Sequence, residues 1–230
     1  MDAVSANEEL SVRDAIVGRH SIRRFLPTPL SAEMIDGILN VAARAPSGVN
    51  AQPWLIHVVT GPARERLSSA ARAAATAGDL GLEYAYLPES MGEPYLSRRR
   101  KLGHDLYARY GIDKNDKVAR QEAMLRNFDF FGAPVGLFFT MERSMSLGSW
   151  LDMGMFMQTV MIAARAFGLE TCPQQAWCDH GNVVHKELGI PADHIILSGM
   201  ALGHADPSAP ENHLVSERVV AGQFSVYHSQ

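Results

Sequence analysis

The stretch APSGVNAQPW, residues 45–54, separates a run with helical periodicity from a run typical of a buried strand. Upstream, a helix is expected to begin near Ser31, with apolar residues at i, i+3, i+4 and i+7: Ile35, Ile38, Leu39 and Ala42. Downstream, WLIHVVT (54–60) has the composition of a buried strand. Connections between such elements usually need only about two to six residues. A longer one, rich in hydrogen-bonding groups, suggests a loop arranged around a ligand.

The same stretch can also be interpreted as a helix stop joined to a plain loop. Pro46 would end the helix, Gly48 would permit a turn, and Asn50 would act as a cap. Ser47, Asn50 and Gln52 nevertheless supply hydroxyl and amide groups that a ligand could use. Taken alone, the stretch favours the helix stop, and the decision depends on the rest of the chain.

The composition is that of a packed globular protein with a slight acidic balance. Hydrophobic residues make up 47% of the chain and charged residues 20%, which is ordinary for a folded domain. The net charge of -4 argues against nucleic acid and anionic membrane as partners, because both attract positive proteins. The two cysteines, Cys172 and Cys178, are too few for a disulfide framework or a four-cysteine zinc site. No metal site is expected.

Neither a secretory signal nor a membrane span is expected. The N-terminal stretch MDAVSANEEL is acidic and lacks the basic start and apolar core of a signal peptide. The most apolar segment, residues 153–169, is interrupted by Gln158 and Arg165 and is short for a bilayer. These observations predict a cytoplasmic protein with no membrane partner.

Periodicity along the chain predicts one domain over residues 1–230, of the α/β or α+β class, with few strands and much helix. Further helices are expected at 12–18, 62–78, 94–111, 114–132, 147–169 and 181–189, and further strands at 135–141 and 194–202. The segment 147–169 is apolar almost all round, which places it at the centre. Residues 79–131 have an irregular start and weaker apolar faces, which predicts a helical lid or excursion. Residues 206–230 are expected to form an extended tail.

The chain lacks the usual glycine-rich phosphate loops, the nucleophile elbow and paired-histidine metal motifs. Instead RHSIRRF, residues 19–25, offers three arginines, a histidine and a serine directly after the first helix. Arginine makes bidentate contacts with phosphate, and serine with backbone N–H groups can complete an anion cradle. Spacing alone favours a solvated basic helix end, because cations are favourable at a helix C-terminus.

RHSIRRF, with APSGVNAQPW about 25 residues later, resembles the combined pattern of the FMN-dependent nitroreductase superfamily. The resemblance runs from about Leu10 to Phe224. FGAPVGLFF (131–139) resembles the central strand of the family, and residues 149–177 its long helix and the turn that meets the flavin. HLVSERVV (213–220) resembles the segment that returns an arginine to the phosphate. The layout is most similar to the nitrobenzoate-reductase-like branch.

The resemblance implies a nitroreductase-like fold, an α/β sandwich whose central, mostly antiparallel sheet is flanked by helices, and an intertwined homodimer with two FMN sites at its interface. On the FMN phosphate it implies Arg19, His20, Ser21, Arg23 and Arg218. On the pyrimidine side or ribityl chain it implies the partner's copies of Ser47 and Asn50, and beside the isoalloxazine Pro173, Gln174 and Gln175. Many members have an acidic residue and a glycine where this chain has Gln175 and Ala176.

The implied activity is reduction of a small nitroaromatic compound, nitro to hydroxylamine, with NADH or NADPH as the electron donor. The mechanism would be ping-pong through flavin N5. Because the cofactor carries this chemistry, no side chain is assigned as catalytic. Reductive dehalogenation, quinone or flavin reduction and other activities of the superfamily stay open, because they differ in the lid.

A second basic stretch, SRRRK at residues 97–101, lies on the predicted lid. It could be a nucleic-acid patch, and an anion-binding module without FMN would then be colourless and bind nucleic acid in a salt-dependent way. The acidic net charge favours a solvated face, or a contact for an anionic substrate or NAD(P)H. We therefore expect no nucleic-acid partner.

Overall fold

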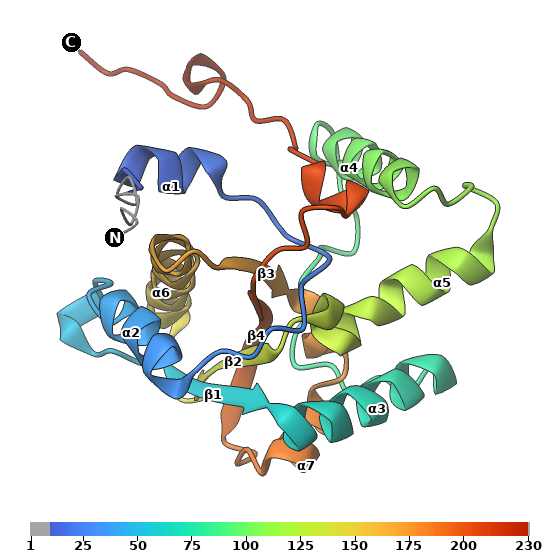
Figure 1. Ribbon diagram of the computed structural model, residues 1–230. Helices are drawn as coiled ribbons and strands as arrows, with labels where there is room; N and C mark the ends of the chain where they lie inside the picture. The colour runs from blue at the N-terminus through green and yellow to red at the C-terminus, as the bar shows by residue number, and fades with distance from the viewer. Residues whose placement is uncertain (1–9, 230) are drawn as a thin grey trace, which may run out of the picture.

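The computed structural model describes residues 10–229, which fold into a four-stranded sheet with helices on both faces (Figure 1). The strands are β1 (Leu55–Thr60), β2 (Val135–Glu142), β3 (Glu170–Gln174) and β4 (His194–Gly203). Their order is β1-β2-β4-β3, and every neighbouring pair is antiparallel. The predicted α+β class and antiparallel sheet are confirmed. Of MDAVSANEEL, all but Leu10 lies outside the described residues.

The α-helices lie close to the predicted ranges. They are α1 (Val12–Gly18), α2 (Ala32–Ala42), α3 (Gly61–Ala77), α4 (Tyr95–Arg109), α5 (Lys117–Leu125), α6 (Leu147–Ala166) and α7 (Gly181–Leu188). Short 3-10 helices are η1 (Gly48–Asn50), η2 (Arg126–Gly132), η3 (Gln175–Asp179), η4 (Pro210–His213) and η5 (Ala221–Gln223). The hydroxyls of Ser11 and Ser31 accept hydrogen bonds from the third residue beyond, as helix N-caps do.

The main differences from the prediction are two helix ends and one strand. α2 ends at Ala42, ahead of Pro46, because residues 43–45 form a turn. The helix predicted at 114–132 leaves the α conformation after Leu125, since Phe130 and Phe131 have φ of 52° and 54°. The strand β3 was not predicted, because Pro173 interrupts it. Proline is tolerated there because β3 is an edge strand of the sheet.

Each face of the sheet covers its own hydrophobic core. Leu137 and Phe139 of β2 point toward α2 and α6, where Ile38 and Val160 are fully buried. Phe138 points to the opposite face, into the core formed with α3 and α7. Alternation along the strand therefore builds the two outer layers.

The helix α6 is buried on one side only. Asp152, Met153, Phe156 and Val160 are buried, whereas Leu147, Leu151 and Met155 form an exposed apolar stripe at i, i+4, i+8. The prediction that this helix is buried all round is therefore confirmed for one side only within a single chain. Within residues 10–229, every helix is too short or too polar to cross a bilayer.

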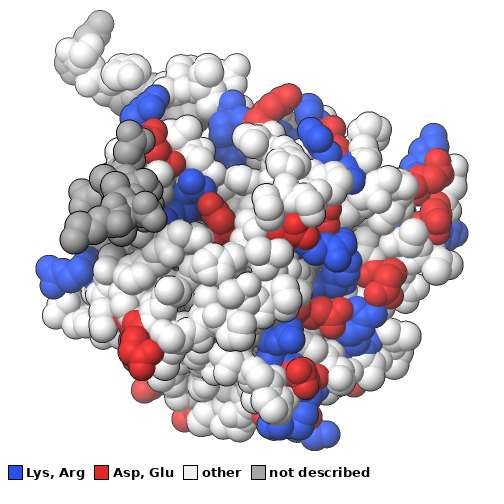
Figure 2. All heavy atoms as spheres, viewed as in Figure 1, with Lys and Arg blue, Asp and Glu red and all other residues white. Residues whose placement is uncertain are grey.

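The segments predicted as lid and tail lie at the periphery. α4 has no buried residue, and α5 buries Ala123 and Leu125. From residue 206 onward the described chain has only the short helices η4 and η5, and its last part reaches away from the body past α1 (Figure 1). In Figure 2, which has the same view as Figure 1, Lys and Arg are interspersed with Asp and Glu over the surface around α3, α4 and α5.

Candidate functional site

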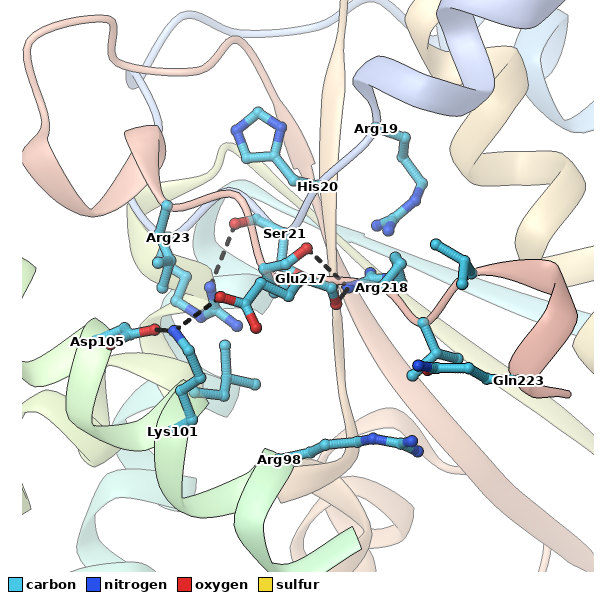
Figure 3. A pocket seen from close by; sticks show the side chains of 15 residues that line it. Arg19, His20, Ser21, Arg23, Arg98, Lys101, Asp105, Glu217, Arg218 and Gln223 are labelled. Carbon is cyan, nitrogen blue, oxygen red and sulfur yellow. Dashed lines mark hydrogen bonds and ion pairs between the residues drawn. The ribbon is translucent and has the colours of Figure 1, made fainter. Parts of the chain in front are cut away.

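A cavity of about 670 Å³ lies between the segment after α1, the helix α4 and the tail (Figure 3). Its volume is in the range of ligand pockets. The five residues predicted around the FMN phosphate all line it: Arg19, His20, Ser21, Arg23 and Arg218. Residues separated by almost 200 positions in sequence are thus brought to one place.

The arginines of this cavity are held without carboxylates. Among residues 10–229, Arg19, Arg23 and Arg218 form no ion pair, and Arg218 donates only to Ser216 and the carbonyl of Glu217. Arg23 makes one long contact, 3.4 Å, with the carbonyl of Ser21. Burial lowers the pKa of the Arg19 guanidinium, and the like charge of Arg218 lowers that pKa further. An anion bound between them would relieve this repulsion.

The two carboxylates in the cavity are both engaged by Lys101. Its Nζ lies 2.7 Å from Asp105 on α4 and 3.3 Å from Glu217 in the tail. The hydrogen bond to Asp105 raises the pKa of Lys101. Lys101 therefore joins α4 to the tail and leaves the arginines available for an external anion.

Asn212 of η4 fixes the backbone of the phosphate segment. Its Oδ1 accepts from the main-chain N–H of Arg23 at 2.8 Å and of Arg24 at 3.2 Å. Its Nδ2 donates to the carbonyl of Arg24 at 2.7 Å. His20 is held from two sides, with one ring nitrogen 2.6 Å from the carbonyl of Asn212 and the other 2.9 Å from that of Gly18. The cradle is therefore preorganised by a residue that does not line it.

Beside Asn212, the buried carboxylate of Glu211 ties three segments together. It accepts from Arg126 of η2 at 2.8 Å and lies 3.5 Å from Arg24. Burial raises the pKa of Glu211, but the hydrogen bond and charge of Arg126, with the charge of Arg24, bring the pKa below its usual value. The carboxylate is thus stabilised in its charged form, which strengthens the hold of η4 on the cradle.

A second, smaller cavity of about 160 Å³ adjoins the first. Arg23 lines both, and Pro173, Gln174 and Gln175 line the second together with Tyr107 of α4 and Tyr110, which follows that helix directly. The three residues predicted beside the isoalloxazine are therefore next to the predicted phosphate cradle. This arrangement suits a ligand with an anionic end and a flat end.

The two glutamines are fixed by different partners. Gln174 donates to the carbonyl of Asn127 at 2.6 Å, and Gln175 donates to the hydroxyl of Tyr84 at 3.0 Å. Tyr84 in turn donates to the carbonyl of Leu197 at 2.6 Å, where the register of β4 shifts. Burial is the main cause that raises the pKa of Tyr84. The side-chain oxygens of both glutamines are buried and lack a protein donor among the described residues.

Ser47 and Asn50 line neither cavity within one chain. They flank a loop held by a hydrogen bond from the N–H of Gly48 to the buried Asp152 of α6, 3.1 Å long. Val49, Asn50 and Gln52 have φ of 48°, 59° and 49°, a region unfavourable for a β-branched residue such as valine. Val49 is fully exposed. Such strain is typical of loops with a functional constraint.

The residues present fit FMN. Unpaired arginines around Ser21 suit a phosphate dianion, and the partnerless oxygens of Gln174 and Gln175 suit the N–H groups of a flavin ring. Nothing in this donor set conflicts with the cofactor. Among the residues that the structure describes, no three His, Cys, Asp or Glu side chains gather as a metal site.

Comparison with known proteins agrees with this assignment. Residues 16–204 match the nitroreductase family. The chain belongs to that family. It is 40% identical over 218 residues to the nitrobenzene nitroreductase of Ectopseudomonas oleovorans, covering 94% of this chain and 96% of the other. It is 40% identical over 221 residues to the 4-nitrobenzoate reductase of Pseudomonas putida, covering 92% and 93%.

Solved structures of the nitroreductase family show the same fold. The crystal structure of the FMN and NADPH-dependent nitroreductase NfnB from Sphigopyxis sp. strain HMH superposes with a TM-score of 0.93. The two chains are 38% identical, and the match covers 96% of this chain and 100% of that one. The nitroreductase-like fold is thereby confirmed for this chain.

Sequence reasoning missed the residues that position this nitroreductase site without lining it. Asn212, Glu211 and Arg126 act through contacts between segments far apart in the chain. The polar stretch from residue 206 carried no periodicity that marked them. The motif HLVSERVV, which begins directly after Asn212, was the one local signal at hand.

Proposed function

We propose that this chain is an FMN-dependent oxidoreductase that uses NAD(P)H to reduce nitroaromatic compounds. The observation that carries the proposal is the set of arginines around Ser21 that form no ion pair among the described residues, beside the glutamine pair, in a chain of the nitroreductase family. Relatives at 40% identity named for nitrobenzene and 4-nitrobenzoate reduction support this substrate class. When bound, FMN supplies the chemistry of two-electron transfer.

The protein's part is to bind, orient and exclude water. Arg19, Arg23 and Arg218, with His20 and Ser21, hold the phosphate end. Pro173, Gln174 and Gln175 border the flat end, where Tyr84 fixes the amide of Gln175. The aromatic substrate would bind next to the flavin ring, on the side of Tyr107 and Tyr110. No side chain is assigned as an acid or base.

The working unit in this proposal is a homodimer. The stripe of Leu147, Leu151 and Met155 on α6 is exposed, as are Phe224 and Tyr227 in the tail. An exposed apolar stripe on a helix, together with exposed aromatic side chains, supports an interface. The strained loop that carries Ser47 and Asn50 projects Val49 into solvent, as expected of a loop that contributes to the partner's site.

Residues 1–230 are proposed to form one domain, in which 79–131 act as a lid over the site and 206–230 as an arm. The exposed surface of α4, which borders both cavities, supports the lid. The need for NAD(P)H supports a cytoplasmic location, where that donor is made and recycled.

The test begins with the absorbance spectrum of the purified protein. A flavin spectrum, with FMN released on denaturation, is expected. NADPH or NADH should then support reduction of nitrobenzene and 4-nitrobenzoate to the hydroxylamines. A colourless protein that does not take up added FMN would contradict the cofactor. A flavoprotein that reduces a quinone or dehalogenates a halophenol but leaves nitroaromatics untouched would replace the proposed substrate class.

A further inference from the structure

The larger cavity contains one arginine beyond those of the phosphate cradle. Arg98 extends from α4 on the wall opposite Arg19 and Ser21, and its guanidinium points toward Gln223 of the tail (Figure 3). A phosphate dianion held by Arg19, Arg23 and Arg218 does not require it. The cavity therefore carries more positive charge than FMN needs.

No carboxylate of the described residues neutralises the positive charge of Arg98. Within residues 10–229 Arg98 forms no ion pair, and its guanidinium lies 5.8 Å from the ring centroid of Tyr95 on the same helix. The nearest basic neighbour in the cavity, Lys101, differs in this respect, because Asp105 and Glu217 both engage it. Of the two α4 cations that line the cavity, Arg98 is therefore the one without an ion pair among the described residues, and it is available to bind an anion.

We propose that Arg98 binds a phosphate group of the nicotinamide dinucleotide and so sets the affinity of the enzyme for its electron donor. The proposal rests on the proposed function. Arginine is suited to this role because its planar guanidinium makes paired hydrogen bonds to phosphate oxygens. The phosphate belongs either to the pyrophosphate of NADH and NADPH or to the 2′-phosphate found in NADPH alone.

The position of Arg98 favours the dinucleotide over a carboxylate on the aromatic substrate. The residues proposed beside the flavin ring, Pro173 to Gln175, line the smaller cavity, which Arg98 does not line. A carboxylate on a nitroaromatic acid is one benzene ring away from the nitro group, so it stays close to the flavin. The phosphates of the dinucleotide are separated from the nicotinamide by at least a ribose, so they can reach a cation outside that cavity.

The experiment compares Arg98→Gln with Arg99→Gln in the FMN-loaded protein. Arg99 is the next residue of α4, is exposed and does not line the cavity, so it controls for the loss of one charge on the helix. Calorimetric titration with NADP+ and NAD+ gives the affinity, and rapid mixing with NADPH and NADH gives the concentration dependence of flavin reduction. We expect Arg98→Gln to weaken nucleotide binding roughly tenfold, as for loss of a charge-assisted hydrogen bond.

The outcomes separate the possible sources. Weakening confined to NADP+ and NADPH assigns the 2′-phosphate, and equal weakening of all four nucleotides assigns the pyrophosphate. Unchanged affinity in Arg98→Gln, an equal loss in Arg99→Gln, or a change confined to the KM for 4-nitrobenzoate would overturn the proposal. Flavin content is measured first, because a wild-type protein that binds no FMN refutes the proposed function itself, whereas normal flavin with unaltered nucleotide affinity refutes only the role of Arg98.

Discussion

Arg19 is the phosphate-site arginine whose pKa shows most directly the need for a bound anion. It is partly buried and forms no ion pair among the described residues, and its pKa is lowered by burial and then by the charge of Arg218, against a smaller opposing effect of Glu170. Burial and the like charge of Arg218 both disfavour the charged form of Arg19, and a bound anion would favour that form. The FMN phosphate would be such an anion, and removal of the Arg19 side chain should therefore weaken FMN binding.

We predict that Arg19→Ala weakens FMN binding by about 10- to 150-fold, the loss of about 1.5–3 kcal/mol expected for a charge-assisted contact. Fluorescence titration of apoprotein with FMN measures the change. The control is Arg66→Ala on α3, an exposed arginine outside both cavities. Equal FMN affinities in the two variants would mean that the phosphate lies elsewhere.

At this scale the sequence predicts the residues that act locally. Arg19, Ser21 and Arg23 are recognisable because they are close neighbours in one motif, and the structure places them in one cavity. Asn212 could not be found in this way. Its amide binds Arg23 and Arg24 across 189 and 188 positions, and a lone asparagine in a polar tail has no pattern that reveals such a contact.

Among the elements, the short helix η4 contributes to stability through the ion pairs of Glu211, and this contribution depends on pH. Because the folded-state pKa of Glu211 is below its usual value of 4.5, its contribution to stability is complete above the unfolded pKa. The contribution is lost as the pH falls through the folded pKa. Arg126 would be left without its carboxylate in Glu211→Gln.

We therefore predict that Glu211→Gln is less stable than wild type by about 1–3 kcal/mol at pH 7, and that the difference shrinks below about pH 4.5. Urea unfolding between about pH 3.5 and 7.5 tests both statements. Glu65→Gln, an exposed position on α3, provides the control. A stability difference that stays constant over the whole range would show that charge is not the cause.

The packing of η3 against β4 depends on a missing side chain at Gly199. A Cβ atom there would lie 2.3 Å from the ring of Trp177, which is fully buried. Gly103 of α4 has no atom within 4 Å of such a Cβ. We predict that Gly199→Ala destabilises the fold by about 1–3 kcal/mol, whereas Gly103→Ala stabilises it by about 0.5–1 kcal/mol. Denaturant midpoints compare the two, and similar midpoints would contradict the packing argument.

Elements were predictable where a repeated pattern specifies them. The stripe from Ile35 to Ala42 gives α2, and the apolar run at 135–141 gives β2. β3 is not predictable in this way, because a five-residue edge strand that contains Pro173 shows no alternation of apolar and polar residues. Its place is set by pairing with β4, a contact between distant segments.

The molecule as a whole leaves apolar surface that one chain does not cover. The sequence predicts a central position for the helix α6, because this helix is apolar almost all round. Leu151 in its exposed stripe is nevertheless 72% exposed. Sequence periodicity reports how many faces of a helix are apolar, but not which chain covers each face. In the homodimer proposed above, a second copy would cover the remaining face, the projecting tail (Figure 1) and the loop that carries Asn50.

We predict a dimer whose FMN site depends on α6. Leu151→Glu should place a charge in the interface and give monomers, because an unpaired buried carboxylate is strongly unfavourable. FMN should be lost with the dimer, since Ser47 and Asn50 of the partner would no longer reach the site. Val118→Glu on α5 is the matched control, as Val118 is 79% exposed and outside both cavities. Light scattering gives the mass, and absorbance gives the flavin content. Monomeric wild-type protein with full flavin occupancy would reject the shared site, whereas a dimeric Leu151→Glu variant would show that the interface lies on another face.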